Sequence, residues 1–182
     1  MQFSQSGAAN TQATLEAASR RARELEISEV VVATTTGETA FKALELFGDA
    51  RLIAVTYHCG FRQPFERVMP DEAQKSLQQK GVTVVSATHA LSGVERSVAQ
   101  RYQGIYPVLV IADTLRLFGQ GTKVAVEVAV MAADAGALSG DDIIAVGGTA
   151  SGADAALVIK PAHMNNFFDL RIREVICKPR QF

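Results

Sequence analysis

The sequence predicts an α/β fold for the whole chain: one domain over residues 1–182, with three layers and a doubly wound, mostly parallel sheet. Short runs rich in Val, Ile and Ala alternate along the chain with longer segments whose apolar residues recur at helical spacing. Several runs are apolar without interruption, which is typical of parallel strands buried on both faces. A chain of this length can bury roughly 70% of its surface in one core.

The first half of the chain contains three of the predicted strands. Residues 14–26 place Leu15, Ala18 and Ala22 on one face, which predicts a helix, whereas residues 1–12 are small and polar and predict a loop. Gly48 and Gly81 follow helical patterns and end them. In order, we expect helix 14–26, strand 27–33, helix 39–47, strand 51–57, helix 71–80, strand 82–86 and helix 94–103.

The second half is less regular. Residues 104–118 fit either a strand at Val108–Ile111 or a helix; we favour the helix because Ile111, Leu115 and Phe118 keep helical spacing. The remaining expected elements are helix 122–138, strand 143–146, strand 155–159, a helical turn at 164–168 and strand 170–177. Charged and apolar residues alternate imperfectly in the last strand, which predicts an antiparallel strand at an edge of the sheet.

Composition and charge narrow the range of partners. The formal net charge is −1 with acids and bases mixed along the chain, which argues against nucleic acid and against a basic membrane-binding face. No apolar run is long enough to span a bilayer, and the N-terminus lacks the pattern of a secretory leader. Cys59 and Cys177 lie far apart and no histidine pair has ligand spacing, so we expect a cytoplasmic protein without a metal site. The expected partner is a small molecule.

The segment that carries most chemical information runs from Val30 to Ala40. β-Branched residues are followed by three hydroxyls and a glycine, and then by a helical pattern. A strand, a tight loop and a helix N-terminus together supply hydroxyls, free N–H groups and a positive dipole end, which suit a phosphate. The alternative is an ordinary turn with Thr36 as helix N-cap. The residues expected to hold the phosphate are Thr34, Thr35, Thr36, Gly37, Glu38 and Thr39.

Each of five predicted strands changes from apolar to polar residues at its carboxyl end. In an open parallel sheet these ends meet in one crevice, where ligands bind. The segments expected to converge there are 34–39, 56–60, 89–96, 147–152 and 160–163. From them, the further residues expected in the binding site are Thr56, His58, His89, Ser92, Gly147, Gly148, Pro161 and His163.

The three histidines are the candidates for proton transfer. His58, His89 and His163 each follow a predicted strand, and imidazole titrates near neutral pH. A carboxylate inside an apolar helix also needs a partner, and Glu127 can pair either with Lys123, four residues earlier, or with a ligand hydroxyl. No motif selects a reaction.

The Thr-Thr-Thr-Gly-Glu-Thr-Ala segment between strand and helix resembles the effector-phosphate loop of the pyruvate kinase C-terminal domain. More widely, the chain resembles a family of free-standing proteins of unestablished function with that fold. The matching segments are 10–11, 33–40, 55–58, His89, 91–97, 131–134, 146–148, 152–154 and 161–169. The resemblance implies that a phosphorylated ligand such as flavin mononucleotide binds in the crevice, with the phosphate on residues 34–39. It does not imply kinase activity, because the catalytic barrel of the kinase has no counterpart here.

Three functions remain open. The first is binding of a phosphorylated small molecule, with flavin mononucleotide as the candidate cofactor. The second is an enzyme that uses the same pocket with one histidine as proton carrier. The third is a regulatory module in which a homo-oligomer responds to the ligand without catalysis.

Overall fold

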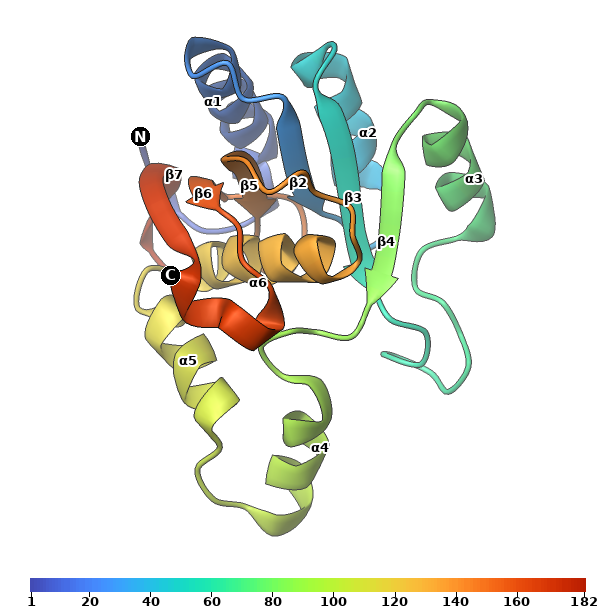
Figure 1. Ribbon diagram of the computed structural model, residues 1–182, viewed down its shortest axis with the longest axis vertical. Helices are drawn as coiled ribbons and strands as arrows, with labels where there is room; N and C mark the ends of the chain where they lie inside the picture. Colours follow the sequence, from blue (N-terminus) through green and yellow to red (C-terminus); the bar gives the residue numbers. More distant parts are fainter.

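A seven-stranded sheet with the order β1-β7-β6-β5-β2-β3-β4 forms the centre of the computed structural model, which describes all residues 1–182 (Figure 1). Neighbouring strands pair in parallel, except that β6 is antiparallel to both β5 and β7. The predicted α/β class, with a mostly parallel sheet and antiparallel pairing toward one edge, is therefore confirmed. The strands are β1 (Gln2–Gln5), β2 (Glu29–Ala33), β3 (Arg51–Tyr57), β4 (Thr83–Ala87), β5 (Ile143–Gly147), β6 (Ala155–Lys160) and β7 (Arg171–Gln181).

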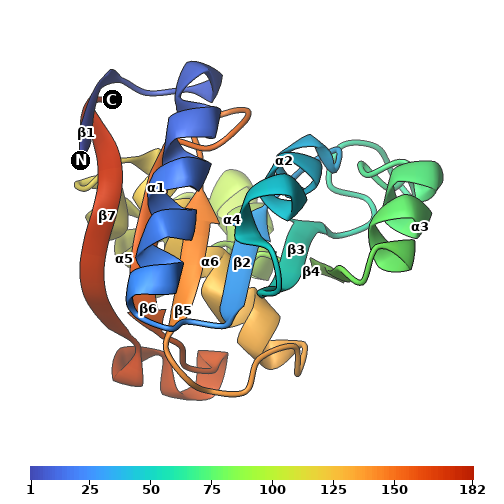
Figure 2. The ribbon, with the colours of Figure 1, turned by 90° about the horizontal axis from the view of Figure 1, so that it is seen from above.

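Helices cover both faces of the sheet, as Figure 2 shows from above. One layer contains α1 (Thr11–Glu24), α2 (Glu38–Phe47) and α3 (Asp71–Gln79), and the opposite face carries α6 (Gln120–Asp134). The 3-10 helices are η1 (Ala8–Asn10) and η2 (Met164–Asp169). None of the helices combines the length and hydropathy that a membrane span requires.

Two apolar cores result from the alternation of side chains along the buried strands. Val30 and Val32 of β2 pack with Leu15 of α1 in one core, whereas Val31 packs with Val126 of α6 in the other. All of these residues are completely buried. This two-sided burial is the reason that β2 has no polar position at its centre.

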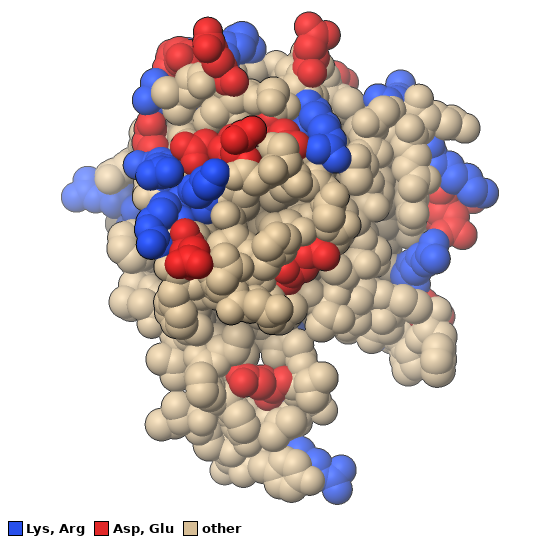
Figure 3. Space-filling model, in the orientation of Figure 1, with Lys and Arg blue, Asp and Glu red and all other residues tan.

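The helices α4 (Gly93–Tyr102) and α5 (Pro107–Arg116) project from the body of the molecule (Figure 1). We call residues 93–116 the arm. The helix α4 buries none of its residues, and α5 buries only Ala112. The face of the arm seen in Figure 3 is nearly free of charged residues, whereas acidic and basic side chains are mixed over α1 and α3.

Three details differ from the sequence-based expectations. Residues 2–5, expected in a loop, form β1 and pair in parallel with the end of β7, so that β7 is not the outermost strand. The sequence of β1 has no apolar pattern, so this strand forms because the unpaired backbone groups at the edge of β7 offer it hydrogen-bond partners. The strand β6 runs against its neighbours, so residues 160–163 lie at the opposite end of the sheet from the other four predicted polar segments.

The helix α6 approaches β5 closely where two glycines face each other. A Cβ atom on Gly147 would lie 2.2 Å from the carbonyl oxygen of Gly121 and 2.6 Å from the backbone nitrogen of Ala125. A Cβ on Gly121 would lie 2.1 Å from Oδ1 of the buried Asp154. Both positions therefore require glycine, because a side chain at either one would keep the first turn of α6 from touching the carboxyl end of β5.

We predict that Gly147→Ala destabilises the protein by about 3 kcal/mol, because the added methyl group meets backbone that must move. Gly136→Ala is the control: that Cβ meets nothing within 4 Å and adds only the strain of a backbone with φ +68°. Its expected cost is about 1 kcal/mol. Urea unfolding measures both. Equal losses in the two variants would show that α6 does not need this close approach.

Candidate functional site

A cavity of about 450 Å³ lies at the carboxyl ends of β2, β3 and β5. Ala33 ends β2 there, and Thr56 and Tyr57 end β3. On the other side the wall is formed by one face of α6, including Gln120, Lys123 and Glu127. The remaining wall comes from the start of α2, from the arm and from the loop that follows β5.

The loop between β2 and α2 is fixed by its own hydrogen bonds. The Thr34 hydroxyl oxygen accepts the N–H of Gly37 at 3.1 Å, and the Thr34 N–H donates to the carbonyl of Val55 at 2.9 Å. The Thr56 hydroxyl donates to the carbonyl of Thr35 at 3.2 Å. The conformation of the turn is thus fixed by the hydrogen bonds of Thr34 and Thr56.

The remaining hydroxyls and N–H groups of this loop are free. Gly37, with φ 103°, is the residue before α2, and no side chain caps the helix, so the alternative in which Thr36 is the N-cap is wrong. The hydroxyls of Thr35 and Thr36 have no protein partner and line the cavity. The first-turn N–H groups of α2 likewise have no acceptor within the helix. These groups can all donate to an anion.

Three helices begin at this cavity. Glu38 and Thr39 line it from the first turn of α2, Gln120 from the first turn of α6, and Ser92 directly precedes α4. None of the three N-termini is capped by a side chain. Each contributes a partial positive charge, so the cavity favours anions before any charged side chain is considered.

Basic side chains add to this potential. Arg62, Arg96 and Arg116 line the cavity, and Glu38 is the one acidic residue of the wall without a basic partner. No ion pair in the structure involves Arg62 or Arg96. Their charges are therefore available to a ligand.

Lys123 and Glu127 form a buried ion pair in the wall formed by α6. Their side chains are 6% and 3% exposed, and the Lys123 ammonium donates to Glu127 Oε2. The other carboxylate oxygen accepts the N–H of Leu91 at 3.0 Å, which ties α6 to the loop before α4. Burial lowers the pKa of Lys123, and the Glu127 carboxylate acts in the opposite direction. Glu127 has thus found its partner within the protein, although both residues still face the cavity.

Aromatic rings form one end of the cavity wall. Phe61 stacks on His89 with ring centroids 4.8 Å apart, and Tyr57 lies 4.2 Å from Phe61. The guanidinium of Arg96 lies over the Phe61 ring at 5.7 Å. His58 packs edge-on to His89 at 5.7 Å, and the Nδ1 atoms of both histidines are buried without a hydrogen-bond partner. Burial lowers the pKa of His89, which keeps the imidazole neutral at pH 7.

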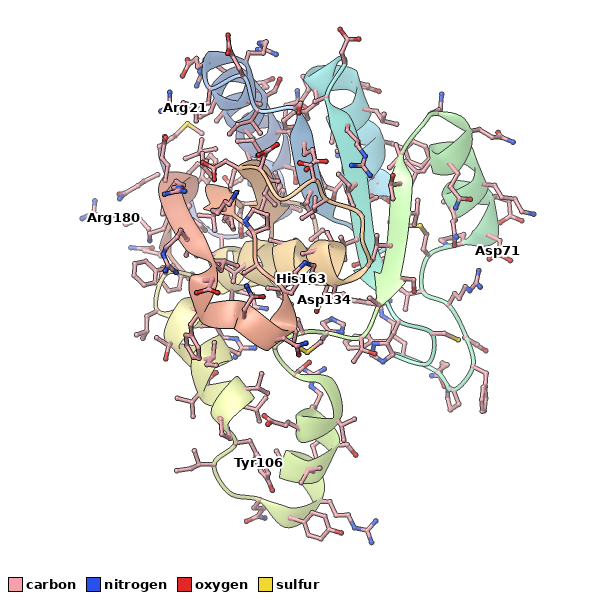
Figure 4. All side chains as sticks on the ribbon, viewed as in Figure 1. Arg21, Asp71, Tyr106, Asp134, His163 and Arg180 are labelled. Atoms are coloured by element: carbon pink, nitrogen blue, oxygen red, sulfur yellow. The ribbon has the colours of Figure 1, made fainter.

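Nine of the residues expected in the site line the cavity: Thr34, Thr35, Thr36, Glu38, Thr39, Thr56, His89, Ser92 and Gly148. Gly37 and His58 lie beside it but do not form its wall. Gly147 contacts α6, so its lack of a side chain serves packing and not the approach of a ligand. The expected place of Pro161 and His163 is wrong because β6 is antiparallel. His163 Nδ1 lies 3.1 Å from Asp134 Oδ1 at the far end of α6 (Figure 4).

Several cavity residues escaped sequence analysis. The missed polar and aromatic members are Tyr57, Phe61, Arg62, Arg116 and Gln120. Tyr57 lies within the expected segment 56–60 and Phe61 directly follows it, so their position in the chain was the available signal. Arg116 ends α5, and only the packing of the arm against α6 brings it there.

Comparison with known proteins places the chain among pyruvate kinase domains. A sequence model of the family described as "Pyruvate kinase, alpha/beta domain" matches residues 12–159. The chain is similar to a pyruvate kinase from Cryptosporidium parvum, with 18% identity and a TM-score of 0.46, over 86% of this chain and 23% of that one. A second structure of the C. parvum enzyme gives 19% identity and a TM-score of 0.39, over 78% of this chain and 21% of that one. The structure of its complex with ADP gives 20% identity and a TM-score of 0.42, over 84% of this chain and 23% of that one. The chain therefore spans less than a quarter of the length of those enzymes.

We predict that His89 makes the protein less stable in acid. Since the folded state lowers the pKa of His89, the unfolded chain binds a proton more readily, and stability falls as the pH drops from about 7 to about 5. His89→Gln removes this contribution, so its unfolding free energy should change less over the same interval. Urea titrations at several pH values measure the difference, and an NMR titration of the imidazole gives the pKa directly. If the unfolding free energy depended on pH equally in wild type and His89→Gln, His89 would not be the source of the acid sensitivity.

Proposed function

Because the chain belongs to the pyruvate kinase alpha/beta domain family, we propose that its cavity binds a phosphorylated small molecule, with flavin mononucleotide as the candidate. The observation that carries the proposal is the convergence of three uncapped helix N-termini on one cavity. An arrangement of this kind stabilises negative charge.

The phosphate is assigned to the start of α2. There the free hydroxyls of Thr35 and Thr36 stand beside the unpaired N–H groups of the first turn. Such a loop binds a phosphate without a nearby lysine, because the N–H groups and the dipole act together. Arg62 and Arg96 supply the neutralising charge.

The remainder of the ligand is assigned to the aromatic wall. Tyr57, Phe61 and His89 line the cavity as a cluster of aromatic rings, and the Arg96 guanidinium lies over the Phe61 ring. Planar heteroaromatic rings bind to such surfaces by stacking, and a cavity of about 450 Å³ falls within the usual range for small-molecule sites. A phosphate at one end and a planar ring at the other describe a mononucleotide.

The proposal predicts a phosphate-dependent affinity. Wild-type protein should bind flavin mononucleotide more tightly than riboflavin, and Thr36→Val should weaken the binding of flavin mononucleotide about tenfold, because one charge-assisted hydrogen bond is lost. Riboflavin affinity should not change. Thr114→Val, on the exposed part of α5 and outside the cavity, is the matched control. Calorimetry measures the affinity of all three proteins for both flavins, and equal affinity for the two flavins in wild type and in Thr36→Val would remove the phosphate assignment.

A second candidate function, ligand-dependent assembly, is favoured by the arm. Val94, Ile105 and Leu117, within or directly after the arm, are 77%, 88% and 75% exposed, and such an apolar surface is typical of a contact between subunits. The same arm supplies Arg96 and Arg116 to the cavity, so a bound anion would shift its position relative to α6.

This candidate predicts that flavin mononucleotide changes the oligomeric mass in native mass spectrometry. Ile105→Asp should abolish the change without weakening the ligand, because Ile105 lies outside the cavity. An unchanged mass with and without saturating ligand would reject assembly and leave the binding function intact.

A further inference from the structure

Lys123 is the one lysine whose side chain lines the cavity. Lys42, Lys75 and Lys80 are exposed on the surface, and Lys160 donates to the carbonyl of Gly140 at the opposite end of the sheet. The Lys123 ammonium has Glu127 as its partner and lies in the α6 wall of the same cavity that the proposed phosphate loop lines from the start of α2. The primary amine, a carboxylate and a place for a phosphate thus occur within one cavity.

Packing alone does not account for this pair. The helix α6 is otherwise rich in Ala and Val, and a buried ion pair can generally be replaced by apolar side chains without loss of stability. Lys123, Glu127 and Met131 follow each other at intervals of four residues and form a single stripe along the cavity. The pair therefore stands where a ligand arrives and not in the centre of the core.

The surroundings favour an amine that can lose its proton. Burial lowers the pKa of Lys123, and the guanidinium groups of Arg116 and Arg96 lower it further, whereas Glu127 raises it. Glu127 is also the group that can accept the proton, since it already receives the Lys123 hydrogen bond. Burial and neighbouring cationic groups are the two features that activate lysine amines as nucleophiles.

We propose that Lys123 forms an imine with a phosphorylated aldehyde or ketone bound in this cavity. This inference rests on the proposed function, because the phosphate loop would orient the carbonyl group of the ligand. It specifies the ligand class further: a phosphate ester that also carries a reactive carbonyl carbon.

The chemistry balances with the residues present. Glu127 takes a proton from the Lys123 ammonium, and the neutral amine attacks the carbonyl carbon. A C–N bond forms, the C=O π bond breaks, and a proton moves from the nitrogen to the new alkoxide oxygen to give a carbinolamine. Glu127 then returns a proton to the carbinolamine hydroxyl, the C–O bond breaks and water leaves. The product is a protonated imine, with Glu127 again ionised. No oxidant or reductant is needed.

Pyridoxal 5′-phosphate is a suitable probe because it carries both an aldehyde and a phosphate. The protein is incubated with this probe or with pyridoxal, imine absorbance is recorded, and borohydride then fixes the imine for peptide mass mapping. We expect Lys123 to carry at least about tenfold more label than Lys80, since the loop holds the aldehyde near the amine. Pyridoxal without the phosphate should not show this preference.

Two variants separate the chemistry from binding. Lys123→Arg keeps the positive charge and the pairing with Glu127 but has no nucleophilic amine, so it should bind the phosphorylated probe without imine absorbance. Glu127→Gln should slow imine formation, because the proton acceptor is lost. Lys80→Arg is the control and should behave as wild type, and flavin mononucleotide should compete with the labelling of Lys123.

The possible results are distinct. Phosphate-dependent label on Lys123, absent with Lys123→Arg, supports the inference. Probe binding that depends on the phosphate but leaves label only on exposed lysines overturns the imine and leaves the proposed function standing. If the wild-type protein binds neither this probe nor flavin mononucleotide, both the imine inference and the proposed function are overturned.

Discussion

The contact between α6 and β5 determines where the site can exist. Gly121 and Gly147 let the two backbones meet with no side chain between them, and the buried Asp154 closes against the same turn. The contact sets the start of α6 at the carboxyl end of the sheet, beside the start of α2. If α6 were displaced by the width of one methyl group, its first turn and the face that carries Lys123 would move away from the phosphate loop.

Local patterns were sufficient to predict most of the elements. Uninterrupted apolar runs indicated β2, β3 and β5, and helical spacing resolved residues 104–118 correctly in favour of α5. What local patterns do not contain is strand direction. The strand β6 looks as apolar as β5, and only the short connection at residues 148–154 reverses it, which moves His163 to the other end of the sheet. The strand β1 has no signal of its own.

In the candidate site, too, some features could be predicted from local sequence and others could not. The loop from Thr34 to Thr39 is continuous in sequence, so its chemistry could be anticipated from hydroxyls placed between a strand and a helix. Arg116 could not be anticipated, because it reaches the cavity through the packing of α5 on α6. The pair Lys123 and Glu127 was visible as a spacing of four residues. That this pair lies in a cavity wall and not in the core could be seen only in the three-dimensional structure.

Charge balance limits what the cavity can hold. Its wall contains four basic residues and two acidic ones, and Lys123 and Glu127 neutralise each other. Arg116 pairs with Asp113 outside the wall, so Arg62 and Arg96 against Glu38 leave one positive charge in excess. A phosphate monoester carries between about −1.5 and −2 charges near neutral pH, so a single such group compensates the wall. Arg62 and Arg96 are exposed, so solvent can compensate their charges, and the proposed phosphorylated ligand would replace that solvent with a direct charge pair.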